Sequence, residues 1–74
     1  MSTAENASLI EQIGEAAGRV WHALQQDGPM SVTKLTKAVD GVPRDVVMQA
    51  IGWLAREDKV WLEETKRGRM ISLR

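Results

Sequence analysis

The apolar residues of this chain change their spacing at Asp58, and this change limits the folds that it can adopt. Between residues 44 and 57 they recur with the period of a helix. Beyond Asp58 apolar residues recur at every second position, Val60 with Leu62 and Ile71 with Leu73, which is the period of a strand. We therefore expect the C-terminal half of the chain to form a helix that leads directly into a β-hairpin.

The hairpin has a definite register if its loop is Thr65–Gly68, because Gly68 then occupies a position that favours a positive φ. This loop places Glu64 opposite Arg69, Leu62 opposite Ile71, and Val60 opposite Leu73. Since side chains alternate between the two faces of a strand, the apolar members of these pairs are expected on the core face. The outer face is expected to carry Trp61, Glu63, Met70 and Ser72.

The first predicted helix, over about residues 4–26, has more apolar surface than one packed face requires. One stripe repeats with helical spacing and is expected in the core: Leu9, Ile13, Ala16, Val20 and Leu24. A second stripe lies beside it: Ile10, Gly14, Ala17 and Trp21. Gly28 suits the left-handed position that follows a helix and Pro29 cannot continue one, so the helix is expected to end there.

A short strand and two shorter helices are predicted next. Met30 is expected in the strand, and Ser31 is expected to cap a helix over about residues 32–39. The third helix is predicted over about residues 43–57, with Pro43 at its first position. Its outward strip is expected to hold Asp45, Gln49, Gly52 and Arg56. With the hairpin at about 59–73, residues 1–74 are predicted to form one domain, mainly α with a small antiparallel β-hairpin.

Composition argues against several kinds of site. The chain has no cysteine and one histidine, His22, so disulfides, thiolate chemistry and the usual zinc ligand sets are excluded. Its paired acids are sequence neighbours, and Glu63 and Glu64 point to opposite faces of a strand, so they do not converge on a substrate. We therefore predict no enzyme activity, no cofactor, no metal and no small-molecule substrate.

The sequence also lacks the signals of a membrane or exported protein. No apolar run approaches the ~20 residues that span a bilayer. The N-terminal segment carries acids and lacks the basic region of a signal peptide. We therefore expect a cytoplasmic protein with no membrane partner.

Charge is balanced overall but unevenly placed. Residues 65–74 hold four bases and no acid, whereas residues 1–64 hold six bases and ten acids. A basic hairpin end on an acidic body favours an anionic partner. The other interpretation is a solvated loop whose charge keeps the protein soluble, and composition alone does not separate the two.

The predicted order of helix, short strand, helix, turn, helix and hairpin resembles the winged helix-turn-helix domain. The resemblance is carried by Ser31-Val32-x-x-Leu35, Val42, Val47, Ala50-Ile51-x-x-Leu54, Lys59-Val60 and the Gly68 loop. The stretch AIGWLAREDKVWLEE, residues 50–64, is similar to a group of short stand-alone prokaryotic winged-helix proteins of unassigned function. Asp58 departs from the pattern, which commonly has glycine there, but aspartate tolerates a left-handed conformation.

The resemblance implies double-stranded DNA as the partner. The candidate DNA-binding residues are Lys66, Arg67 and Arg69 of the loop, Arg44, Gln49 and Arg56 of the third helix, and Lys34 of the second. Arginine suits guanine and glutamine suits adenine, but Asp45 on the same strip would repel phosphate. We therefore expect a weakly sequence-specific DNA-binding module led by the basic wing, such as a small transcriptional regulator or an accessory nucleoid-type protein.

The alternative is a protein-interaction or dimerisation module that keeps the winged-helix fold without DNA readout. Its support is the spare apolar surface, which we interpret as the interface of a homodimer. The candidate interface residues are Ile10, Gly14, Ala17, Trp21 and Trp61. Loops and the N-terminus covering these side chains would be the simpler explanation, and the sequence leaves both open.

Overall fold

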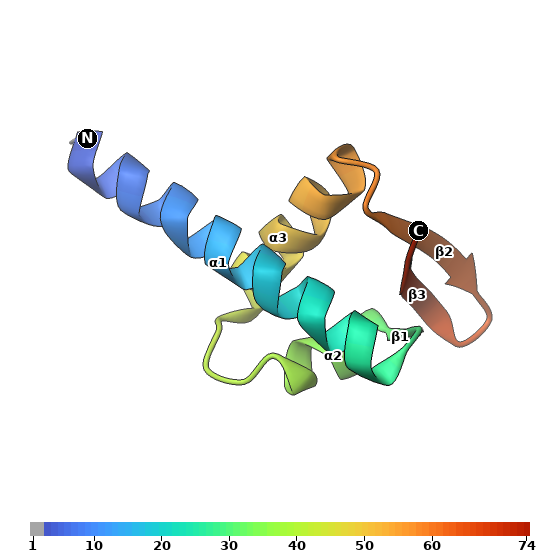
Figure 1. Cartoon of the computed structure of the whole chain (residues 1–74). Coiled ribbons are helices and arrows are strands. Elements are labelled where there is room, and N and C mark those ends of the chain that lie inside the picture. Colours follow the sequence, from blue (N-terminus) through green and yellow to red (C-terminus); the bar gives the residue numbers. More distant parts are fainter. Residues whose placement is uncertain (1–2) are drawn as a thin grey trace.

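Three helices and a small antiparallel sheet make up the part of the chain that the computed structural model describes, residues 3–74, with side chains from Ser8 onward. The elements are α1 (Thr3–Asp27), β1 (Met30–Ser31), α2 (Val32–Ala38), α3 (Arg44–Arg56), β2 (Val60–Thr65) and β3 (Gly68–Leu73). The N-terminal part of α1 projects away from the rest of the molecule (Figure 1). The predicted fold class, mainly α with a small antiparallel sheet, is confirmed.

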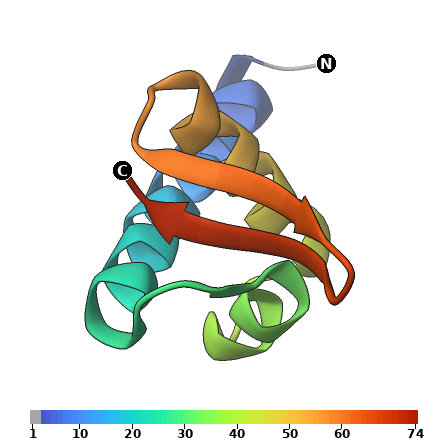
Figure 2. The ribbon, with the colours of Figure 1, turned by 90° about the vertical axis from the view of Figure 1, so that its right-hand side faces the viewer.

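The sheet has the order β1-β3-β2 and covers one side of the helices (Figure 2). The hairpin has the predicted register, with Val60 opposite Leu73, Leu62 opposite Ile71 and Glu64 opposite Arg69. The loop is shorter than predicted, because Thr65 pairs with Gly68 and only Lys66 and Arg67 form the turn. Gly68 has the expected positive φ, 113°. The remaining strand, β1, pairs with β3 and places Met30 opposite Ile71.

Helix ends and turns follow the local signals of the sequence at most positions. Gly28 has φ 78°, and its N–H donates to the carbonyl of Leu24 at 2.9 Å. The Ser31 hydroxyl oxygen accepts from the backbone N–H of Lys34 at 3.1 Å, as expected of an N-cap. Pro43 is itself the N-cap of α3, so the prediction of Pro43 at the first helical position was wrong by one residue. Asp58 adopts the left-handed conformation, with φ 59°.

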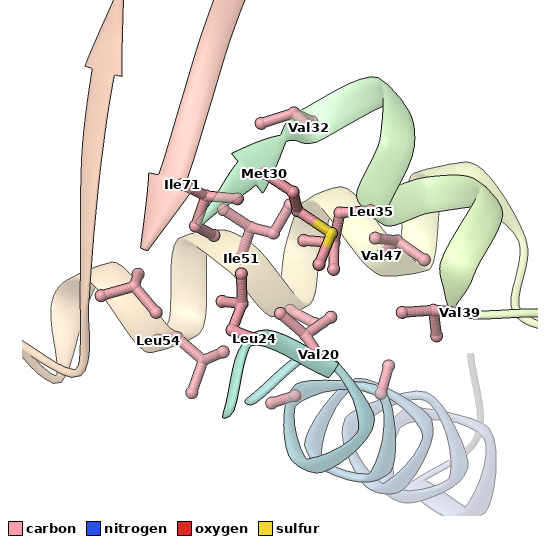
Figure 3. Packing of buried hydrophobic residues seen from close by; sticks show 14 of the residues in the cluster. Val20, Leu24, Met30, Val32, Leu35, Val39, Val47, Ile51, Leu54 and Ile71 are labelled. Carbon is pink, nitrogen blue, oxygen red and sulfur yellow. The ribbon is translucent and has the colours of Figure 1, made fainter. Parts of the chain in front are cut away.

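The core lies where the three helices meet the sheet (Figure 3). Val20 and Leu24 of α1 contribute to it from one side and Leu35 of α2 from another. Together with side chains of α3 and the sheet they form one cluster, which includes Val47, Ile51, Leu54, Met30 and Ile71. The cluster therefore ties all three helices to β1 and β3.

Two residues that the spacing placed in the core are exposed. Leu9 is 50% exposed and belongs to the N-terminal part of α1, the part that projects from the rest of the molecule (Figure 1). Leu62 is 42% exposed, and its strand, β2, is an edge strand of the sheet. In both cases the side chain belongs to the predicted apolar face of its element, but the neighbouring elements do not cover it.

Among residues 3–74, none of the helices has both the length and the apolar content needed to cross a bilayer.

Candidate nucleic-acid interface

A surface hollow lies between the wing tip and the first turns of α2 and α3. Arg44 enters it from α3, and Arg67 and Arg69 enter it from the wing. Ser31 and Thr33 supply hydroxyl groups. The remaining lining residues are Val32, Met48, Glu64, Thr65 and Gly68. We call this the basic hollow, because three arginines converge on it from two elements that are distant in the sequence.

The wing tip is held by one side chain, Thr65. Its hydroxyl donates to the carbonyl of Gly68 at 2.9 Å and accepts from the backbone N–H of Arg67 at 3.2 Å. These bonds fix the backbone of the turn on both sides of Lys66 and leave the side chains of Lys66 and Arg67 exposed. Two cations therefore extend from a defined turn.

Ion pairing divides the basic residues of the wing into two groups. Arg69 pairs with Glu64 on the neighbouring strand at 3.1 Å, and both side chains are exposed. Such a pair contributes little to stability but lowers the net charge of the hollow. Among side chains from Ser8 onward, the other ion pairs involve Lys59 and Arg74, and none involves Lys34, Arg44, Lys66 or Arg67.

Arg74 does not belong to the basic surface, although the sequence placed it in the same charge run. It lies at the end of the hairpin that is opposite the turn, where its backbone N–H donates to the backbone carbonyl of Lys59 at 3.1 Å. Its guanidinium group lies over the ring of Trp61 at 4.1 Å and pairs with Asp58 at 3.3 Å. The basic segment 65–74 is thus split between the two ends of the wing.

The other candidate DNA-binding residues lie outside the basic hollow. Lys34 is exposed on α2, directly after Thr33 of the hollow. Gln49 is exposed further along α3, and Arg56 lies in the last turn, about 18 Å along the helix axis from Arg44. Of the candidates on α3, only Arg44 joins the wing residues.

A second concave surface lies between α1, α3 and the base of the hairpin. Gly14, Ala17, Gly18 and Trp21 line it from α1, and Trp53 and Leu54 line it from α3. Glu57, Asp58, Lys59, Leu73 and Arg74 complete it. We call this the apolar groove, because its two largest side chains are Trp21 and Trp53, which are 38% and 41% exposed.

The structure exposes only part of the stripe on α1 that was predicted to form the dimer interface. Gly14 and Trp21 line the apolar groove, whereas Ala17 is buried and forms its floor. Ile10 lies exposed on the projecting part of α1, and Trp61 lies beneath Arg74, whose side chain lines the groove. Trp53 was not among the candidates. The spacing of residues along α3 does not show which element lies across from this side chain.

These elements in this order, with a helix beside a β-hairpin wing, define a winged helix-turn-helix domain. The chain belongs to the family described as "Winged helix-turn-helix domain (DUF2582)", whose model matches residues 8–73. The uncharacterized protein MJ1608 of Methanocaldococcus jannaschii is 37% identical over 65 residues, covering 85% of this chain and 91% of that protein. The solution NMR structure of protein BT2368 from Bacteroides thetaiotaomicron superimposes with a TM-score of 0.75 at 35% identity, covering 85% of this chain and 76% of that one.

Proposed function

We propose that this protein binds double-stranded DNA through its wing, with weak sequence preference. The observation that carries the proposal is the basic hollow, where Arg44 and Arg67 meet the hydroxyl groups of Ser31 and Thr33. Arginine side chains and hydroxyl groups are the usual donors to phosphate oxygens, and these contacts position a protein on a duplex. Lys66 and Lys34 extend the same surface on either side.

The weak preference follows from what α3 presents outward. Its outer strip carries one acid, Asp45, one amide, Gln49, and one base, Arg56, separated by Gly52. The bidentate contacts that read bases in the major groove are arginine on guanine and glutamine on adenine. On this strip, only Gln49 and Arg56 can make them. A protein that relies on phosphate contacts fits the role of an accessory nucleoid-type protein or a broad regulator in the cytoplasm.

The salt dependence of binding tests this function directly. The logarithm of the binding constant falls with the logarithm of salt concentration at about −0.9 per phosphate contact. With Arg44, Lys66 and Arg67 as the charged contacts, we expect a slope of about −2.7 for one protomer and about −5.4 for a dimer. Fluorescence anisotropy with a labelled duplex measures it. Failure of any duplex to bind at low salt would remove the DNA proposal.

The contribution of α3 is tested by Gln49→Ala. We expect affinity for a random duplex to stay within about twofold, because an amide releases no counterions. Any change should appear only in the ranking of duplex sequences, measured by competition. A loss on random DNA as large as that caused by removing a wing cation would mean that α3, rather than the wing, leads the contacts.

A second function, self-association or protein binding, is supported by a different face of the molecule. The apolar groove leaves Trp21 and Trp53 partly exposed, and Ile10 projects beyond the body at 54% exposure. We infer that the protein forms a homodimer through this face. DNA binding and dimerisation use separate surfaces, so they can be tested one at a time.

A further inference from the structure

Large apolar side chains remain exposed along α1 and across from it on α3. Ile10 is 54% exposed, Trp53 41% and Trp21 38%. Exposed apolar surface of this kind marks a site of protein association.

Much of this surface has the shape of two parts that could fit each other. The first part is the projecting end of α1, which exposes Ile10 and extends the molecule to 42 Å along its longest axis, against 24 and 22 Å along the others. The second part is the apolar groove. Its floor is open, because a Cβ added at Gly14 or Gly18 would meet nothing within 4 Å. The groove can therefore admit another helix closely.

The sequence of α1 pairs with itself in the antiparallel direction. Two pairs of exposed residues are centred on nearly the same point of the helix, close to Ala16: Ile10 with Trp21, and Gly14 with Gly18. Two antiparallel copies that cross at this point bring each residue against its pair in the other copy. The small pair lies at the crossing, where the axes are closest, and the large pair lies where the helices diverge. Such an arrangement allows close contact without overlap.

We propose that two copies of this protein associate by exchanging these parts, so that Ile10 of each inserts into the apolar groove of the other. There it contacts Trp21 and Trp53 of the partner subunit. This geometry rests on the self-association proposed above and is independent of DNA binding. It assigns a role to Trp53, which the stripe on α1 alone does not include.

Nuclear Overhauser effects between Ile10 and Trp21 test the geometry. Within one helix these residues are separated by about 16 Å, which is too far for a direct effect. A signal between the Ile10 methyl groups and the Trp21 indole must therefore come from two molecules, and we expect it in concentrated samples. A dimer that lacks this signal would overturn the geometry but not self-association. A monomer by sedimentation at high micromolar concentration would overturn both.

A matched pair of variants tests how much the same contact contributes to the affinity of the dimer. Ile10→Asp places a carboxylate where the proposal buries an isoleucine, and both copies in the dimer carry the change. We expect the dimer dissociation constant to rise roughly a hundredfold or more. Gln12→Asp adds the same side chain and charge change on the opposite side of α1 and should leave it unchanged within about threefold. Equal effects of the two variants would contradict the proposal, and circular dichroism confirms that both remain folded.

Discussion

Replacing Lys66 and Arg67 together by alanine is expected to weaken binding to every duplex by on the order of fiftyfold per protomer at about 0.1 M salt. The two side chains are exposed on a fixed turn and have no ion-pair partner among side chains from Ser8 onward. Each lost phosphate contact removes the release of about 0.9 counterions, so the loss on a dimer that uses both wings is on the order of a few thousandfold. The slope of binding against salt should flatten in the same experiment.

The matched control is the double variant Arg19→Ala and Lys37→Ala. It also removes one arginine and one lysine, but neither lines the basic hollow or the apolar groove. Arg19 donates to the carbonyl of Asp40, and Lys37 is exposed in the last turn of α2. We expect a small loss from this variant. If both double variants weakened binding equally, net charge rather than the wing would govern affinity.

Leu35→Ala is expected to lower the free energy of unfolding by about 3–5 kcal/mol. Leu35 is fully buried, and a small domain has a narrow stability margin. Since total stability is usually about 5–15 kcal/mol, this single change removes a large part of it. Urea denaturation followed by tryptophan fluorescence, at one fixed protein concentration, measures the loss.

Leu62→Ala is the natural control, because it makes the same chemical change at an exposed position on β2. We expect it to cost about 1 kcal/mol or less, since much of the side chain already contacts water. A similar cost at both positions would show that burial in the helical core does not distinguish these two leucines.

The comparison of Leu35 with Leu62 also shows how much of the fold the sequence predicts. The period of apolar residues identifies the face of each element, and the position of Gly68 sets the hairpin register, because both are local properties of the chain. How completely the neighbouring elements cover a face is not a local property. For that reason Leu9 and Leu62 belong to the predicted apolar faces but remain exposed.

The part of the candidate site that the sequence predicts is the part formed by charged residues close together in the chain. The cations of the turn are evident in the sequence, and their proximity to Arg44 follows from the fold. The pairing of Arg69 with Glu64 required both the register and the side-chain geometry. The apolar groove was not predictable, because its walls come from α1, α3 and the hairpin base, and no spacing within one segment brings Trp21 toward Trp53.

The turn of the wing separates the residues that shape it from the residues that carry its charge. Thr65 and Gly68 hold the backbone through hydrogen bonds and a positive φ, whereas Lys66 and Arg67 extend into solvent. The two exposed positions can therefore accept many side chains at little cost to folding. Within one scaffold, the sign and strength of the charge at the wing tip become adjustable, so evolution or design can change which polyelectrolytes the wing attracts while the domain keeps its structure.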